Sequence, residues 1–115
     1  MLKISEGRNN DVSILKLEGN VIMGGPSVQL HDAVTGVTER GTKKILLDLG
    51  GVKYLDSSGI AELVNSMNSL SKSGGQLVLC NLPDRVTEVL TLSSLISVFE
   101  TFDSEIEAIA ALKES

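Results

Sequence analysis

Alternating apolar and polar residues at the start of the chain predict a β-hairpin. Residues 2–4 open one strand and residues 12–17 form a second, because side chains two positions apart lie on the same face of a sheet. The polar cluster of residues 8–11 between them is typical of a turn. Gly19 and Asn20 then predict the end of the second strand.

Two stretches carry the spacing of an amphipathic helix. After Gly24-Gly25-Pro26, apolar residues recur at positions 30, 33, 34 and 37, and Gly41 ends the pattern. A second helix follows residue 59 and ends at Gly74-Gly75. The apolar face of the second helix consists of Ile60, Leu63, Val64, Met67 and Leu70.

Residues 45–49 and 76–80 are nearly continuous apolar runs, which are typical of strands buried on both faces of a sheet. With the second helix between them, they form a strand–helix–strand unit. We therefore expect these two strands to run parallel, joined by a right-handed crossover.

The last third of the chain repeats this pattern on a smaller scale. A short helix begins at residues 83–84, and residues 97–100 predict an edge strand. Asp103 is the candidate cap of a final helix, with Ile106 and Ile109 expected to face inward.

The length of 115 residues fits one compact domain. We expect residues 1–115 to form one α/β domain, a mixed sheet of four or five strands packed with about four helices. No apolar stretch reaches the ~20 residues of a membrane-spanning helix, and the N-terminus does not have the pattern of a signal peptide. A single cysteine fits a reducing compartment, so we expect a cytoplasmic protein without a membrane partner.

Charge and composition argue against several kinds of chemistry. The net charge is −5, Lys and Arg are scattered and Trp is absent, whereas nucleic-acid binders usually show a basic patch and aromatic platforms. His31 and Cys80 are the only residues of their types, so the pattern contains no catalytic set, metal site or cofactor site. We expect Cys80 to be a small buried hydrophobe and His31 to lie on a helix surface.

The most informative polar residues, Asp56-Ser57-Ser58-Gly59, stand at the predicted start of the second helix. The loop before them follows a buried parallel strand, and binding sites commonly lie at the carboxyl ends of such strands. A helix start also presents unpaired N–H groups and the positive end of the helix dipole. If Asp56 or Ser57 caps the helix, the Ser58 hydroxyl is free to face solvent, and Gly59 would let another protein approach it. Plain capping without further function is the alternative.

Residues 46–60, which end in Asp56-Ser57-Ser58-Gly59-Ile60, resemble the signature stretch of STAS domains. The chain is most similar to the bacterial anti-sigma factor antagonists, also called anti-anti-sigma factors. The resemblance extends over the whole chain, from the N-terminal hairpin and first helix to residues 74–77 and 98–99. It implies the STAS fold for residues 1–115.

The resemblance also implies a phosphorylation switch. In that family the second serine of the motif, which matches Ser58, is phosphorylated by a partner anti-sigma factor, a GHKL-type serine kinase. The unphosphorylated antagonist binds the kinase and frees a sigma factor, and a PP2C-type phosphatase restores the serine. The antagonist is not itself an enzyme. Asp56, Ser57 and Gly59 match the flanking motif, and the kinase-facing surface is matched by Ile22, Met23, Gly24, Gly25, Ile60 and Glu62.

One position departs from the family pattern. Well-known members carry an acidic residue at the end of the second strand, and the matching residue here is Ile22, followed by Met23. If these two side chains are exposed, they make an apolar rim that suits a different partner. In the alternative interpretation, both simply point into the core.

Three other hypotheses remain open at this point. Ser57 or Ser58 would act as a catalytic nucleophile only with a base in reach, and His31 is the one candidate. Asp48, near a strand end, is the candidate acceptor of a receiver-like domain that is phosphorylated on aspartate. Within the family, the chain could instead be a STAS module of another kinase–antagonist circuit or of a stress-signalling assembly.

Overall fold

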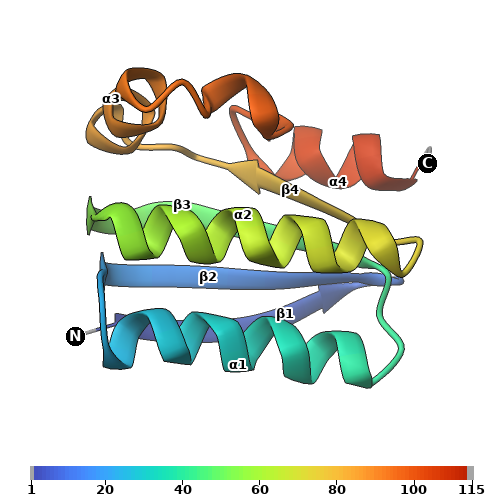
Figure 1. The fold of residues 1–115 in the computed structure, drawn as a ribbon. Coiled ribbons are helices and arrows are strands. Elements are labelled where there is room, and N and C mark those ends of the chain that lie inside the picture. Colours follow the sequence, from blue (N-terminus) through green and yellow to red (C-terminus); the bar gives the residue numbers. More distant parts are fainter. Residues whose placement is uncertain (1, 114–115) are drawn as a thin grey trace.

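The computed structural model describes residues 2–113. Within them, five strands form one mixed sheet whose spatial order follows the chain (Figure 1). They are β1 (Leu2–Asn9), β2 (Val12–Val21), β3 (Lys44–Leu55), β4 (Gln76–Cys80) and β5 (Thr101–Phe102). β1 and β2 pair antiparallel as the expected hairpin, and every later strand runs parallel to its neighbour. The predicted α/β class and the predicted parallel pair are confirmed.

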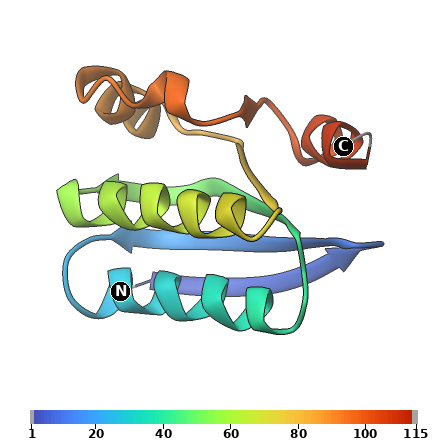
Figure 2. The ribbon, with the colours of Figure 1, turned by 45° about the vertical axis from the view of Figure 1, so that its right-hand side comes forward.

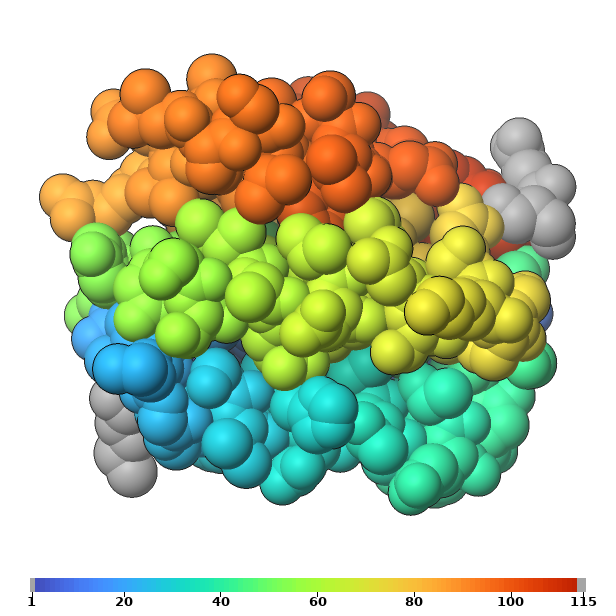
Figure 3. All heavy atoms as spheres, viewed as in Figure 1, coloured from blue at the N-terminus to red at the C-terminus, as the bar shows by residue number. Residues whose placement is uncertain are grey.

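Four α-helices cover the sheet within the same residues: α1 (Gly25–Glu39), α2 (Ser57–Lys72), α3 (Asp84–Leu92) and α4 (Glu105–Lys113). α1 and α2 lie side by side on one face of the sheet (Figure 1; Figure 2), and α3 packs into the same core, whereas α4 packs into a smaller core on the other face. Figure 3 shows α1, α2 and the orange segment that holds α3 as adjacent bands across the molecule. None of the described helices is long and apolar enough to cross a membrane.

β3 lies at the centre of the sheet, and its side chains are buried on both faces. Ile45, Leu47 and Leu49 enter the core beneath α1, α2 and α3, whereas Leu46 enters the smaller core under α4. Each of these four side chains is at most 1% exposed, and burying one such side chain stabilises a fold by roughly 1.5–3 kcal/mol. The prediction of a central strand buried on both faces is confirmed.

β3 is longer than the predicted residues 45–49, because it continues through a pair of glycines to Leu55. Its pairing with β2 shifts register beside Glu18, which lies opposite Gly51. A Cβ atom on Gly51 would lie 2.7 Å from Glu18 Cγ and 2.9 Å from the Leu17 carbonyl oxygen, so a glycine is needed where the two strands approach this closely. The expected loop is therefore strand, and the carboxyl end of β3 moves to Leu55.

The edge strand predicted over residues 97–100 is wrong. Ile96–Val98 form one turn of 3₁₀ helix, and β5 is limited to Thr101–Phe102. Phe99, between these two elements, is buried in the larger core. The apolar pattern that suggested a strand therefore reflects the burial of Phe99 rather than strand pairing.

The predicted cap of the last helix is also wrong. Ser104, not Asp103, accepts a hydrogen bond at its hydroxyl from the Glu107 amide, at 3.2 Å. α4 consequently begins one residue later than a cap at Asp103 would require.

The face that α4 turns to the sheet also differs from the prediction. Ala108 and Leu112 lie four residues apart, on the same face of the helix, and they enter the core under α4. Ile109 packs at the edge of that core, as expected in part, but Ile106 is 82% exposed and does not face inward.

A carboxyl pair joins α4 to the sheet. Glu105, the first residue of α4, interacts with Asp48 of β3, and Lys16 Nζ lies 3.6 Å from Glu105 Oε2. Hydrogen bonding to Asp48, together with burial, raises the pKa of Glu105 above its ordinary value of 4.5. Burial alone would raise the pKa of Asp48, but hydrogen bonds from Glu105 and from the Gly50 amide outweigh burial and lower that pKa. Glu105 therefore keeps its proton to a higher pH, while Asp48 carries the charge.

We expect Glu105→Gln to reduce the pH dependence of stability. Because the pKa of Glu105 is raised on folding, its stabilising contribution is complete below pH 4.5 and declines as the pH rises through its pKa in the folded protein. Gln is neutral at every pH, so the melting temperature of the variant should fall less than that of the wild type between pH 4.5 and 7. The contribution of Asp48 has the opposite sign and is lost only as the pH falls below 3.8, outside this window.

Glu107→Gln is the matched control, because Glu107 is an exposed residue of the same helix turn. Its melting temperature, followed by circular dichroism across the same pH range, should track the wild type. If the melting temperatures of Glu105→Gln and the wild type change with pH in parallel, the raised pKa of Glu105 is contradicted.

Candidate functional site

Asp56 caps α2. β3 ends at Leu55, the backbone of Asp56 is extended, and its Oδ1 accepts a hydrogen bond from the Gly59 amide at 2.9 Å. This bond satisfies one of the amides that a helix start leaves unpaired. Of the two expected caps, Asp56 and Ser57, the structure uses Asp56.

The second carboxylate oxygen of Asp56 holds a different segment. Oδ2 accepts a hydrogen bond from the Met23 amide at 3.0 Å, across 33 residues of sequence, and the Asp56 amide donates to the Val21 carbonyl oxygen at 3.3 Å. The amide of Gly59 and then that of Met23 favour the charged carboxylate, so they lower the pKa of Asp56. An ionised Asp56 thus ties the loop between β2 and α1 to the start of α2.

Gly59 is buried against the end of β2. A Cβ atom at this position would lie 2.1 Å from the Val21 carbonyl oxygen and 2.8 Å from Leu55 Cδ1. We expected the missing side chain to open Ser58 to another protein, and the structure corrects this interpretation. The glycine is required because α2 and β2 approach each other closely within the chain.

The hydroxyl groups of Ser57 and Ser58 take no part in the hydrogen bonds of the described residues. Ser57 is exposed and Ser58 is half-buried, and neither hydroxyl makes a hydrogen bond within residues 2–113. Because Asp56 provides the cap, the Ser58 hydroxyl stands in the first turn of α2 without a partner from the part of the chain that is described.

The loop beside this helix start exposes apolar surface. Met23 is 75% exposed and Val28, in the first turn of α1, is 56% exposed, whereas Ile22 is half-buried. Gly24 and Gly25 are both exposed, and Gly24 has a φ of +93°, a backbone conformation that favours glycine. The interpretation that Ile22 and Met23 both point into the core is therefore wrong for Met23. We refer to Ile22, Met23 and Val28 as the apolar rim.

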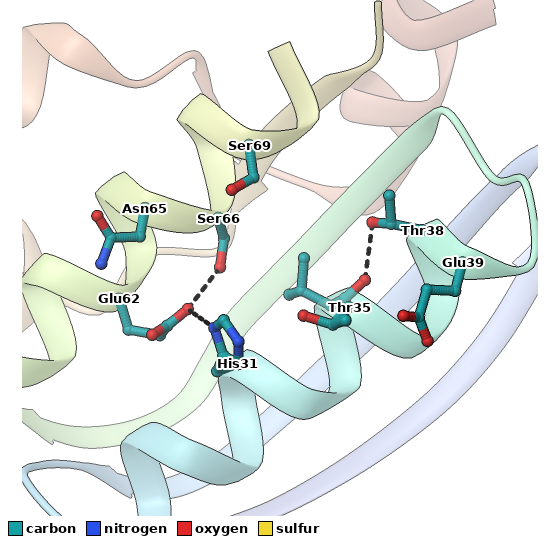
Figure 4. Close-up of a pocket in the computed structure, with 9 residues that line it drawn as sticks. His31, Thr35, Thr38, Glu39, Glu62, Asn65, Ser66 and Ser69 are labelled. Carbon is teal, nitrogen blue, oxygen red and sulfur yellow. Dashed lines mark hydrogen bonds and ion pairs between the residues drawn. The ribbon is translucent and has the colours of Figure 1, made fainter. Parts of the chain in front are cut away.

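Ile60 and Glu62, the other two residues expected at a partner surface, have contacts within the chain. Ile60 packs against the larger core. Glu62 Oε2 accepts a hydrogen bond from Ser66 Oγ at 3.1 Å and lies 3.2 Å from His31 Nδ1 (Figure 4). Glu62 therefore joins α2 to α1, one turn beyond Ser58, and its side chain is only 13% exposed.

A groove of about 220 Å³ runs between α1 and α2 beside the contact of Glu62 with His31 (Figure 4). Periodicity alone could not show it, because only helix packing brings these two helix surfaces together. Within residues 2–113, no cluster of three or more His, Cys, Asp or Glu side chains could hold a metal ion. The groove is lined by His31, Val34, Thr35, Thr38, Glu39, Glu62, Asn65, Ser66 and Ser69.

Comparison with known proteins identifies the family. The model of the STAS domain family matches residues 4–108. BtrV of Bordetella bronchiseptica, named as a candidate anti-sigma factor antagonist, is 30% identical over 112 residues, which cover 97% of this chain and 96% of BtrV. The chain belongs to the STAS domain family.

Solved structures share the fold of this STAS domain. A candidate anti-sigma factor antagonist from Thermotoga maritima matches with a TM-score of 0.84 and 28% identity, over 96% of this chain and 94% of that one. The anti-sigma factor antagonist SpoIIAA in its unphosphorylated form gives a TM-score of 0.75 at 17% identity, over 100% of both chains. SpoIIAA of Bacillus in the phosphorylated form gives 0.72 at 19% identity, over 95% of this chain and 98% of that one.

The geometry of this STAS domain does not support a serine nucleophile. His31 lies on a helix surface, as expected, but its Nδ1 pairs with Glu62. Within the described residues, no hydrogen bond joins His31 to Ser57 or Ser58. The base that such a nucleophile requires is therefore not placed beside either serine.

The side chains of Asp48 and Cys80 are both engaged within the fold, which does not favour the receiver-like hypothesis for Asp48. The Oδ1 atom of Asp48 accepts a hydrogen bond from the Gly50 amide at 2.9 Å, and the carboxyl group also interacts with Glu105. Cys80 is buried, as predicted, and burial, followed by the nearby charge of Asp48, raises the pKa of its thiol to about 12. A thiol with so high a pKa is protonated and inert at neutral pH.

We expect Gly59→Ala to destabilise the STAS domain by roughly 1–3 kcal/mol, the usual cost of overpacking. The added methyl group would meet the Val21 carbonyl oxygen, which belongs to the backbone and cannot rotate away. Gly36→Ala is the matched control, since Gly36 is also helical and the nearest atom to an added Cβ is Arg40 Nη1, at 4.0 Å. Alanine there should stabilise the helix by roughly 0.5–1 kcal/mol.

Chemical denaturation of both glycine variants measures these changes in the free energy of unfolding. A Gly59→Ala protein as stable as the wild type would show that the first turn of α2 can move away from β2 at little cost.

Proposed function

We propose that this STAS domain, residues 1–115, is an anti-sigma factor antagonist that acts as a phosphorylation-switched binding protein in the cytoplasm. Its unphosphorylated form binds an anti-sigma factor that is a GHKL-type serine kinase, and this binding releases a sigma factor. Phosphorylation of Ser58 ends the interaction, and a PP2C-type phosphatase restores it. The domain itself is a binding protein rather than an enzyme, and neither nucleic acid nor a membrane takes part.

The state of Ser58 is the observation that carries this proposal. Asp56 occupies the cap of α2, so the Ser58 hydroxyl lies in the first helical turn with no hydrogen bond to residues 2–113. Its oxygen would attack the γ-phosphorus of ATP bound to the kinase. The bond to ADP breaks, and the hydroxyl proton passes to a base of the kinase. Hydrolysis by the phosphatase regenerates the hydroxyl and releases inorganic phosphate.

A phosphate at Ser58 is compatible with the fold. It adds about −1.5 to −2 charges at neutral pH, and a negative group at a helix N-terminus is favourable by roughly 0.3–1 kcal/mol. A protein of the same fold supports this expectation, because phosphorylated SpoIIAA still superposes on this chain with a TM-score of 0.72.

The effect of the phosphate would fall on the partner. The apolar rim, with Met23 75% exposed, lies on the segment that Asp56 ties to the α2 start. A partner surface that covers the rim would have to bring the phosphate out of water, which is costly without a paired charge. A penalty of ~3 kcal/mol weakens binding about 100-fold. Since the chain already carries a net charge of −5, the switch acts through local charge rather than net charge.

The exposed Met23 favours one alternative within the same mechanism. Ile22 stands where the family often carries an acidic residue, and the exposed apolar side chain of Met23 follows it. In this alternative, the recognised kinase belongs to another kinase–antagonist circuit or to a stress-signalling assembly. The kinase that an immobilised Ser58→Ala protein captures would decide between these circuits, because phosphorylation at that site cannot release it.

We expect Ser58→Asp to bind the captured kinase about 100-fold more weakly than the wild type, since the added carboxylate places charge at the covered surface. Ser58→Ala should bind with wild-type affinity and keep binding when ATP is added. Ser57→Asp is the matched control for a charge one residue away. Isothermal titration calorimetry gives the affinities, and mass spectrometry after incubation with the kinase and ATP maps the modified residue.

Modification confined to residues other than Ser58 would overturn the site. Equal affinities for the wild type and Ser58→Asp would overturn the charge mechanism.

A further inference from the structure

We propose that a phosphate on Ser58 also releases the loop between β2 and α1, because it displaces the Asp56 carboxylate from the Met23 amide. Asp56 would then be the positioning residue through which the state of Ser58 reaches the apolar rim. This inference rests on the proposed phosphorylation of Ser58.

The two oxygens of Asp56 serve two separate segments. Oδ1 accepts a hydrogen bond from the Gly59 amide at 2.9 Å, inside α2, and Oδ2 accepts one from the Met23 amide at 3.0 Å, in the loop. Within residues 2–113, the Met23 bond is the one hydrogen bond that joins loop residues 22–24 to the start of α2. The loop's remaining bonds run to α1. The Ser27 amide donates to the Ile22 carbonyl, and the Val28 amide and the Ser27 hydroxyl donate to the Gly24 carbonyl, each at 3.1 Å.

A phosphate at Ser58 would compete with Asp56 for the same place. Ser58 follows Asp56 by two residues, and both belong to the helix start whose free amides attract one anion. Two anions in this position repel each other, and the repulsion is strong near a protein surface at such short range. The phosphate, with three acceptor oxygens, can take over the helix amides. A phosphate that stays in the first turn cannot also replace the bond between Asp56 and the Met23 amide.

Loss of that bond would free the part of the loop that carries the apolar rim. Met23 is 75% exposed, so little packing holds it in place once its amide is released. Gly24, with a φ of +93°, provides a backbone pivot on the α1 side. The phosphate would therefore act on a partner twice, by its charge and by altering the placement of the Met23 side chain.

Amide exchange of the free protein, followed by NMR, tests the release without any partner. Phosphoserine is introduced at position 58 during synthesis, and a second protein carries it at position 69, an exposed residue of the same helix. The Met23 amide should exchange at least tenfold faster with phosphoserine at 58, and at the unmodified rate with phosphoserine at 69. The Gly59 amide should remain protected in all three proteins, because an anion still caps the helix.

Asp56→Asn separates the two bonds of Asp56. The single amide oxygen of Asn can cap α2 through the Gly59 amide, as Asn commonly does, but it leaves no acceptor for Met23. This variant should show fast exchange at Met23, slow exchange at Gly59 and an unchanged circular dichroism spectrum. If this variant does not fold, the Met23 exchange rates of the proteins with phosphoserine at 58 and at 69 still test the inference.

Met23 exchange within twofold of the unmodified rate when position 58 carries phosphoserine would overturn the inference. The outcome is distinct from failure of the proposed function. Weakened kinase binding with Met23 still protected would leave the switch intact and remove the coupling. Release of Met23 with unchanged kinase binding would support the coupling and overturn the proposed switch.

Discussion

The close approach of the first turn of α2 to the end of β2 is the constraint on which the candidate site depends. It is possible only because Gly59 has no side chain where the Val21 carbonyl oxygen lies. The approach puts the Asp56 amide within reach of Val21, and it puts the Asp56 carboxylate between a helix amide and a loop amide. The placement of the helix cap, the loop and the first-turn serines follows from this one contact.

The electrostatics of the helix start are those that the proposed switch requires. The amides of Gly59 and Met23 hold the Asp56 carboxylate and lower its pKa, and the amides of the helix start would also bind a phosphate. A carboxyl pair elsewhere in the domain, Asp48 and Glu105, belongs to the junction between the sheet and α4. It concerns the stability of that junction, whereas the Asp56 site is the one to which we assign recognition.

The elements that periodicity predicted well are those whose burial is set by their own residues. The hairpin, α1, α2 and the parallel strands β3 and β4 fall in this group, since each has a regular apolar face. The errors concern segments whose conformation depends on a neighbour. β3 extends to Leu55 because Gly51 permits close pairing with β2, and Phe99 is buried without forming a strand. In α4, Ala108 and Leu112 rather than Ile106 face the sheet.

By itself, the sequence determined that a capped helix begins within Asp56-Ser57-Ser58, with Asp56 or Ser57 as its cap. These are local matters, because a cap and its amide lie three residues apart. Only the tertiary structure decided that the second oxygen of Asp56 holds Met23, that Gly59 serves packing rather than access, and that Glu62 pairs with His31. The first and last of these contacts join residues 31 or more positions apart, and the Gly59 contact depends on backbones that meet only when the sheet forms. No pattern of spacing along the chain predicts contacts of this kind.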